Sequence, residues 1–184
     1  MTAKRPDDAE LVTRARSGDV SAFETLVREH TRAVYGHALR FFGDAHSAED
    51  VVQEVFIKVY RSLATYDGNA AFSTWLFRVT RNACLDAVRA GRRRPMPIDP
   101  VDVALETPGD LADEVAVSAT LEQAMQSLPP EDRDALQAVT LFGLTYAEAG
   151  VALGVPTGTV KSRVFRARRA LIAVLGVGRG GDQA

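Results

Sequence analysis

The segment TYAEAGVALGVPTGTVKSRVFRARRAL, residues 145–171, contains two predicted helices separated by a glycine. Thr145 and Glu148 have the spacing of a capping box, which predicts a short helix over 147–153. Gly154 can adopt the left-handed backbone of a tight turn. A second helix is predicted over 159–175, with Thr157 as its N-cap. This order of elements is typical of a helix-turn-helix.

The second of these helices is strongly basic. Between residues 157 and 175 there are five basic residues and no acidic one. A buried stripe is predicted from Val160, Val164, Ala167 and Leu171, which leaves the basic residues outside it. The alternative is a merely solvated basic face, but a helix-turn-helix favours insertion into the major groove of DNA. The residues predicted to contact DNA here are Thr157, Thr159, Lys161, Ser162, Arg163, Phe165, Arg166 and Arg169.

The rest of the chain also follows helical periodicity, and no segment favours a strand. Helices are predicted over 8–17, 20–42, 73–90 and 131–142, and another follows Ser47 as N-cap. The buried stripe of that last helix is predicted to be Val52, Val55, Phe56, Val59, Tyr60 and Leu63. The fold class is therefore predicted to be all-α, with two small helical domains over 8–94 and 115–176.

An acidic segment separates the two domains. Residues 95–132 contain nine acidic residues and no lysine or arginine, and Pro95, Pro97 and Pro100 lie at its start. Proline disfavours helix, so residues 95–114 are predicted to form a flexible linker. The net charge of −2 thus hides a separation of acidic and basic segments.

Composition indicates a soluble protein of the cytoplasm. The 184 residues are 46% hydrophobic, and no run is long and apolar enough to insert into a membrane. The N-terminus lacks the apolar stretch of a signal peptide, and the single cysteine, Cys84, is expected to be a buried thiol. His30, His37 and His46 are expected to be ordinary packing or surface residues, so no metal or cofactor is predicted.

Two stretches of the N-terminal half carry unusual polar residues. Asp50, Glu54, Lys58 and Arg61 share one helix face, which by itself indicates a solvated surface with i, i+4 pairs. Residues 78–94 hold six arginines against one acidic residue, and aromatic residues precede them. A basic groove with aromatic platforms is what single-stranded DNA requires.

The sequences AEDVVQEVFIKVYR (residues 48–61) and FSTWLFRVTRNACLD (residues 72–86) resemble the extracytoplasmic function (ECF) group of RNA polymerase sigma factors. LPPEDR (128–133), GLTYAE (143–148) and GTVKSR (158–163) resemble the −35-reading domain of the same family. The resemblance covers about residues 9–94 and 115–175, with the motifs in the same order. It implies a factor that binds core RNA polymerase, through its β′ and β subunits, and directs initiation at promoter DNA.

The resemblance also implies site residues. Residues that would bind core polymerase are Asp50, Gln53, Glu54, Ile57, Lys58 and Arg61. Residues that would read and melt the −10 element are Phe72, Arg78, Arg81, Asn82, Arg89, Arg92 and Arg93. Trp75 is expected to pack in the core, whereas Phe72 is expected to cradle a flipped base. The linker would thread the RNA path of the polymerase or act as a plain tether, and family members commonly have an anti-sigma partner.

Two other functions compete with this interpretation. A two-domain helix-turn-helix regulator would bind duplex operators without core polymerase. A metal-dependent nuclease could use Asp44, Glu49, Asp50 and Glu54, but no general acid or further ligand cluster follows them. Neither explains two basic surfaces joined by an acidic segment, so a sigma factor without enzymatic activity is the favoured prediction.

Overall fold

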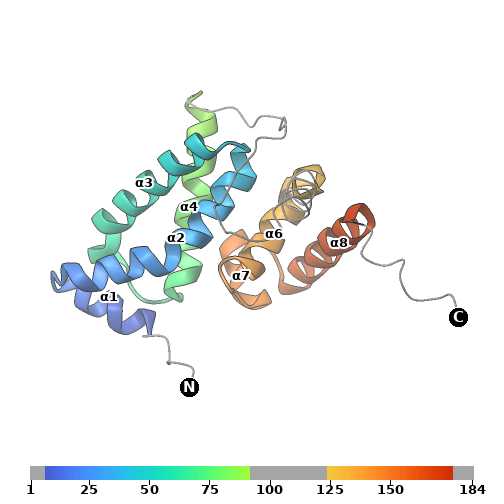
Figure 1. Ribbon diagram of the computed structural model, residues 1–184. Coiled ribbons are helices and arrows are strands. Elements are labelled where there is room, and N and C mark those ends of the chain that lie inside the picture. The colour runs from blue at the N-terminus through green and yellow to red at the C-terminus, as the bar shows by residue number, and fades with distance from the viewer. Residues whose placement is uncertain (1–6, 92–123, 176–184) are drawn as a thin grey trace, which may run out of the picture.

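The computed structural model describes residues 7–91 and 124–175, and every regular element in these two ranges is a helix (Figure 1). The all-α prediction is therefore confirmed. The first range contains α1 (Asp8–Arg16), α2 (Val20–Phe42), α3 (Ala45–Ser62), the short 3-10 helix η1 (Leu63–Thr65) and α4 (Phe72–Arg89). The second contains α6 (Pro130–Thr140), α7 (Tyr146–Leu153) and α8 (Thr157–Leu175). The predicted linker over 95–114 lies outside the described residues.

The N-terminal bundle forms around α2, which packs against α1 and α3, while α4 closes the core from the other side (Figure 1). Apolar side chains at helical spacing fill this core, and those exposed by no more than 1% include Leu26, Val34, Ala38, Phe42, Val51, Val55, Val59, Leu76 and Phe77. Cys84 is buried as expected.

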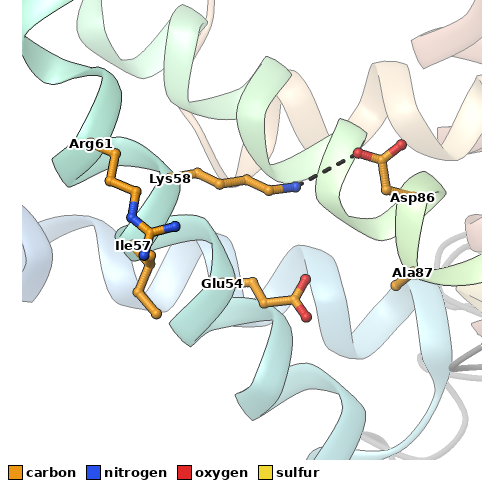
Figure 2. A pocket seen from close by; sticks show the side chains of 6 residues that line it. All are labelled: Glu54, Ile57, Lys58, Arg61, Asp86 and Ala87. Atoms are coloured by element: carbon orange, nitrogen blue, oxygen red, sulfur yellow. Dashed lines mark ion pairs between the residues drawn. The ribbon is translucent and has the colours of Figure 1, made fainter. Parts of the chain in front are cut away.

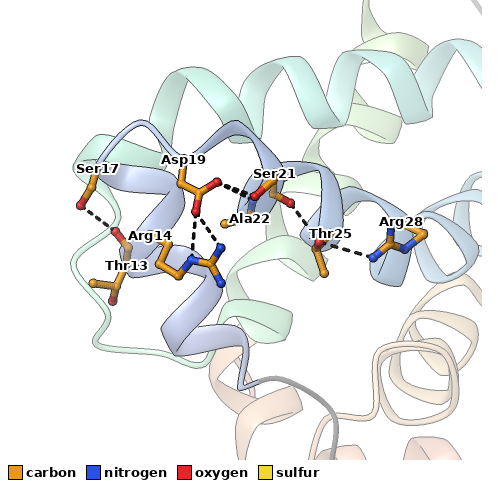
Figure 3. A network of polar contacts seen from close by, with 8 residues as sticks. All are labelled: Thr13, Arg14, Ser17, Asp19, Ser21, Ala22, Thr25 and Arg28. Carbon is orange, nitrogen blue, oxygen red and sulfur yellow. Dashed lines mark hydrogen bonds and ion pairs between the residues drawn. The ribbon is translucent and has the colours of Figure 1, made fainter.

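The turn between α1 and α2 is held by a polar network (Figure 3). Asp19 is the N-cap of α2 and accepts a hydrogen bond from the Ala22 amide. The same carboxylate accepts from the Arg14 guanidinium at 2.7 Å and from the Ser21 hydroxyl at 2.6 Å. These bonds, with Ser21 the strongest cause, lower the pKa of Asp19 to about 2. The network fixes the angle at which the chain enters α2.

Helix α3 begins earlier than the sequence predicts. Asp44, not Ser47, is the N-cap, because its carboxylate accepts from the Ser47 amide at 2.7 Å. The predicted stripe is also partly wrong. Tyr60 is 65% exposed, while Val51 is fully buried and takes a place in the core. Val51 and Tyr60 lie on opposite edges of the stripe, so spacing alone could not predict which of the two would be buried.

The C-terminal bundle packs α6 across α8, with α7 against both. The capping box of α7 is present, since Thr145 and Glu148 each bond to the other's backbone. Gly154 has a φ of 69°, the left-handed turn that the sequence predicts. Helix α8 begins at Thr157 rather than Thr159, because the Pro156 carbonyl already accepts from the amides of Thr159 and Val160. Thr157 is thus the first residue of the helix and not its cap.

Candidate functional sites

We define the docking face as the outward side of α3, which carries Asp50, Gln53, Glu54, Ile57, Lys58 and Arg61. The structure brings these six residues together on one helix face, opposite the buried Val51, Val55 and Val59. Ile57 lies in the middle of the charged residues and is 50% exposed. Ile57 thus gives this face one exposed apolar side chain among charged and polar ones.

A shallow cavity of about 340 Å³ lies between the docking face and α4 (Figure 2). Its α3 side is formed by Glu54, Ile57, Lys58 and Arg61, and its α4 side by Asp86 and Ala87. The ammonium of Lys58 lies 3.6 Å from the carboxylate of Asp86, so this ion pair spans the cavity. Asp86 is a member of this site that the sequence did not single out, because it is on a different helix.

The residues of helix α4 that are predicted to contact DNA differ in their exposure to solvent. Asn82 and Arg89 are exposed, while Arg78 and Arg81 are half-buried. Arg92 and Arg93 lie outside the described residues. The guanidinium of Arg81 donates to the Asp134 carboxylate at 2.6 Å, and Arg78 donates to the Val151 carbonyl at 2.6 Å. Both acceptors belong to the C-terminal bundle.

The aromatic residues at the start of α4 pack against each other. Phe72 is only 3% exposed, with its ring centroid 5.2 Å from His30 and 5.8 Å from Trp75. No face of Phe72 is open to a base in this conformation, so its burial does not favour the predicted role in base stacking. Trp75 packs against the core as expected but is partly exposed.

Helix α8 carries its basic residues away from the bundle core. Val160, Val164 and Ala167 are buried as predicted, whereas Leu171 is half-buried. Exposed along the rest of the helix are Thr157, Lys161, Ser162, Phe165, Arg166, Arg168 and Arg169, and Thr159 and Arg163 are half-buried. Phe165 is 61% exposed, and the Arg169 guanidinium lies 5.8 Å from its ring centroid. The ring and the charge therefore form one composite surface on α8.

Arg166 is partnered within its own bundle. Its guanidinium donates two hydrogen bonds, of 2.6 and 2.9 Å, to the buried carboxylate of Asp132 on α6. This bond raises the pKa of Arg166 above its already high value. Asp132 and Asp134 are two residues apart, about 200° around a helix, so one faces α8 and the other faces α4. The sequence assigned Asp132 only to the acidic segment.

Histidine residues form no metal site in the described part of the chain. His37 is fully buried, with Phe77 and Phe142 rings at 5.7 and 6.1 Å, which confirms the packing role expected of it. His30 contacts Asp8 at 3.2 Å, and His46 is exposed beside Asp50. Within the described ranges no helix is long and apolar enough to cross a membrane.

Both bundles match known sequence families. Sigma-70 region 2 matches residues 26–94, and Sigma-70 region 4 matches residues 118–171. These matches define a transcription protein with the two-part organisation of a sigma factor. They do not favour a regulator that acts without polymerase, because region 2 is not part of the helix-turn-helix.

Individual relatives narrow the class. The chain is 38% identical to the RNA polymerase sigma-H factor of Pseudomonas aeruginosa, over 89% of this chain and 91% of that protein. It is 35% identical to the ECF RNA polymerase sigma-E factor of Escherichia coli, over 89% of this chain and 92% of that protein. The sigma factor RpoE of Bartonella quintana, solved in complex with the anti-sigma factor NepR, matches with a TM-score of 0.66 and 25% identity. This match covers 85% of the chain and 98% of RpoE. The protein belongs to the ECF group of RNA polymerase sigma factors, whose partners are core RNA polymerase and promoter DNA.

Proposed function

We propose that each of the surfaces described above has a separate binding role. Residues 8–94 form sigma domain 2, which binds the β′ subunit of core polymerase through the docking face and reads and melts the −10 element with α4. Residues 115–176 form sigma domain 4, which reads the −35 element with α8. Residues 95–114 link the two domains, and the β subunit contributes further contacts. The protein acts as an initiation factor in the cytoplasm and not as an enzyme.

The observation that carries the docking assignment is the position of Ile57. It is half-exposed at the centre of the docking face and lines the cavity shared with α4. Burial of an apolar side chain within a rim of charges gives both affinity and orientation in a protein complex. A surface made only to contact DNA would have no need of acidic residues such as Asp50 and Glu54.

For DNA contact, α8 offers the matching chemistry. Lys161 and Arg169 are exposed on the side away from the core, and Phe165 adds an apolar surface that suits the methyl group of thymine. On α4, Asn82 can both donate to and accept from a base edge, while Arg78, Arg81 and Arg89 supply charge. Arg92 and Arg93 extend this basic stretch in the sequence.

Charge reversal on the docking face tests the core-binding role. We expect the double substitution Asp50→Lys and Glu54→Lys to weaken binding to core RNA polymerase by about tenfold or more, because complementary charges across the interface become like charges. Binding is measured by fluorescence anisotropy of the labelled full-length protein. Binding of the same variant to duplex DNA through α8 should remain at the wild-type level.

The matched control is Glu29→Lys, which makes the same kind of charge change at an exposed position of α2 outside the docking face. It should bind core polymerase as the wild type does. If the double variant also binds normally, the docking assignment is wrong. The function as a whole is tested by transcription with core polymerase from a template library randomised in the promoter region. A sigma factor should enrich transcripts from particular promoter sequences, whereas a regulator that acts without polymerase should enrich none.

An anti-sigma partner is part of this proposal. RpoE of Bartonella quintana was solved with an anti-sigma factor, and the match to this chain covers most of both proteins. We therefore propose that a protein of this kind restrains the chain until it is needed.

A further inference from the structure

The guanidinium of Arg166 on α8 is held in a fixed orientation by the carboxylate of Asp132 on α6. Its Nε and Nη2 atoms donate to the two carboxylate oxygens at 2.9 and 2.6 Å, so the contact is bidentate. The Asp132 side chain is only 4% exposed, whereas the Arg166 side chain is 57% exposed. Arg166 is therefore fixed on the side of the protein and open on the side of the solvent.

The position of Asp132 follows from the start of α6. Pro130 is the first residue of α6, and Asp132 lies in its first turn, where the positive end of the helix dipole favours a negative charge. Because α6 packs across α8, this turn lies against α8. A buried carboxylate is costly unless it is hydrogen-bonded and paired with a cation, and Arg166 supplies both. The pairing thus holds the guanidinium in place.

The bidentate contact leaves a second pair of N–H groups on Arg166. Asp132 accepts from Nε and from one side of Nη2. The remaining N–H groups, on Nη1 and on the outer side of Nη2, form an equivalent pair that points away from Asp132. Such a pair binds two neighbouring acceptors at once. DNA offers acceptor pairs of this kind as O6 and N7 of guanine and as the oxygens of a phosphate.

A fixed guanidinium differs from the other cations of α8 in what it adds to recognition. Lys161 is exposed, and a lysine ammonium is a point charge on a flexible stem, which attracts DNA without a preferred direction. A guanidinium whose plane is already fixed adds direction, and it loses less conformational freedom when it binds. The pairing of Arg166 with Asp132 therefore suits one particular acceptor pair on the DNA.

We propose that Asp132 is a positioning residue for promoter recognition: it does not touch DNA, and it holds Arg166 so that the outer N–H pair meets one acceptor pair of the −35 element. The proposal rests on the reading of that element by α8 under the proposed function. The acceptor pair is a guanine edge or a phosphate, which share this chemistry and which the test distinguishes. In both cases, loss of the carboxylate has the same effect on recognition as loss of the guanidinium.

Two substitutions separate the carboxylate from the guanidinium. Asp132→Asn keeps the size of the side chain but replaces one acceptor oxygen by an NH₂ group, so the bidentate contact is lost. Arg166→Lys keeps the positive charge and removes the outer N–H pair. The matched control is Glu131→Gln, which makes the same charge change one position earlier in α6. Glu131 is exposed and acts on Arg166 through its charge.

The measurement uses the full-length protein in complex with core RNA polymerase. Transcripts from the template library randomised in the promoter region give the base preference at each position, and a single promoter that the wild type selects gives the yield. Base preference compares templates within one reaction, so a variant that is only less stable keeps the wild-type preference.

The two kinds of acceptor predict different losses. If Arg166 meets a guanine, Asp132→Asn and Arg166→Lys should both reduce the preference for that guanine by about tenfold. If Arg166 meets a phosphate, both should lower the yield from all templates by a common factor and leave the base preference unchanged. Glu131→Gln should match the wild type in both measurements.

The double variant shows whether Asp132 acts through Arg166. Once the guanidinium is gone, Asp132→Asn should cause no further loss of preference or yield. A carboxylate with only a structural role would lower the yield equally with and without Arg166→Lys, and that result would overturn the proposal. Circular dichroism checks the fold. If Asp132→Asn does not fold, Asp132→Glu takes its place, because it keeps the charge but moves the carboxylate by one methylene, and the same losses are expected.

The outcomes separate this proposal from the proposed function. Wild-type preference and yield in the Asp132 variants, with losses in Arg166→Lys, would refute the positioning role and leave α8 as the helix that reads DNA. Wild-type behaviour of Arg166→Lys would refute the contact of Arg166 with DNA, and the proposal with it. A wild-type protein that selects no promoter would contradict the sigma-factor function itself.

Discussion

At the scale of single residues, the helix-turn-helix depends on one glycine inside α7. Gly150 is fully packed, and a Cβ atom there would lie 2.8 Å from the Val155 carbonyl oxygen. The Val155 amide also donates to the Gly150 carbonyl at 3.0 Å. The chain after the turn thus returns onto the backbone of α7, and this close approach sets the position at which α8 begins.

Substitution of Gly150 by alanine should therefore be destabilising, although alanine is the better helix former. We expect the free energy of unfolding to fall by about 1–3 kcal/mol, since the atom in the way belongs to the backbone and cannot rotate aside. Thermal unfolding followed by circular dichroism measures the change. Gly158→Ala is the comparison, because nothing lies within 4 Å of a Cβ atom there. A Gly150→Ala protein as stable as Gly158→Ala would contradict the close-approach argument.

At the scale of elements, side chains just before the helices decide where they start. Asp19 caps α2, Asp44 caps α3 and Thr145 caps α7. The capping box of α7 is reciprocal: the Glu148 amide donates to the Thr145 hydroxyl, and the Glu148 carboxylate accepts from the Thr145 amide. The Thr145 hydroxyl also donates to the Glu148 carboxylate, and the two bonds from Thr145 to this carboxylate lower the pKa of Glu148, with the bond from the backbone amide the larger cause.

Thr145→Ala should remove the hydroxyl that closes this box. We expect a loss of about 1 kcal/mol in the free energy of unfolding, the usual cost of losing a threonine cap. Thr140→Ala serves as the control, because that hydroxyl only donates to the Leu136 carbonyl within α6. Chemical denaturation of both variants gives the comparison, and equal stability of the two would mean that the box contributes nothing.

The sequence predicted the C-terminal ends of helices, which glycine marks, better than their N-terminal starts, which capping residues mark. Gly43 and Gly91 mark the ends of α2 and of the turn after α4, and both have positive φ. The start of α3 was misplaced because Asp44 and Ser47 are both good caps and stand three residues apart. Tyr60 was assigned to the core for a related reason: periodicity locates a stripe but does not fix its width.

At the scale of the whole molecule, the buried His37 makes the contact between the two bundles sensitive to pH, because it lies against Phe77 of one bundle and Phe142 of the other. Burial lowers its pKa to about 4; Asp134 opposes this shift, whereas Arg81 and Arg133 add to it. The side chain of Gln137 also opposes the shift, but less than Asp134 does. The charged imidazolium is thus unfavourable while the two bundles pack around His37. Stability that depends on neutral His37 is complete above the ordinary pKa near 6.5 and is lost as the pH falls from there towards about 4.

We therefore expect the contact between the two bundles to weaken as the pH is lowered below 6.5, the ordinary pKa of the imidazole. The full shift corresponds to about 3 kcal/mol of free energy. The radius of gyration, followed through an acid titration, measures the effect. The His37→Leu variant keeps the apolar contact without a titrating group, so its two bundles should stay in contact over the same pH range. If the wild type and the His37→Leu variant lost the contact between the bundles at the same pH, titrating groups other than His37 would be responsible.

The contact between the bundles could not be predicted from the sequence, although the bundles themselves could. Arg81 and Asp134 are 53 residues apart, and residues 92–123 lie between their bundles. No local pattern marks the two as partners. Asp134 stands in a run of charged residues that suggests a solvated helix start, and Arg81 stands in a basic stretch that suggests nucleic acid. Periodicity specifies which face of a helix is buried, but not which other helix buries it.

The pairing of Arg166 with Asp132 has a consequence for the ionic strength at which α8 works. A free arginine that meets a DNA phosphate releases a condensed counterion, and each such contact steepens the fall of affinity with salt. The carboxylate of Asp132 already neutralises the Arg166 guanidinium and accepts from two of its N–H groups. A phosphate that binds the remaining N–H groups therefore meets a nearly neutral pair and releases fewer cations from the DNA. Recognition by α8 should then depend less steeply on salt concentration than its number of basic residues suggests, and a larger share of its affinity should come from uncharged contacts such as those of Phe165.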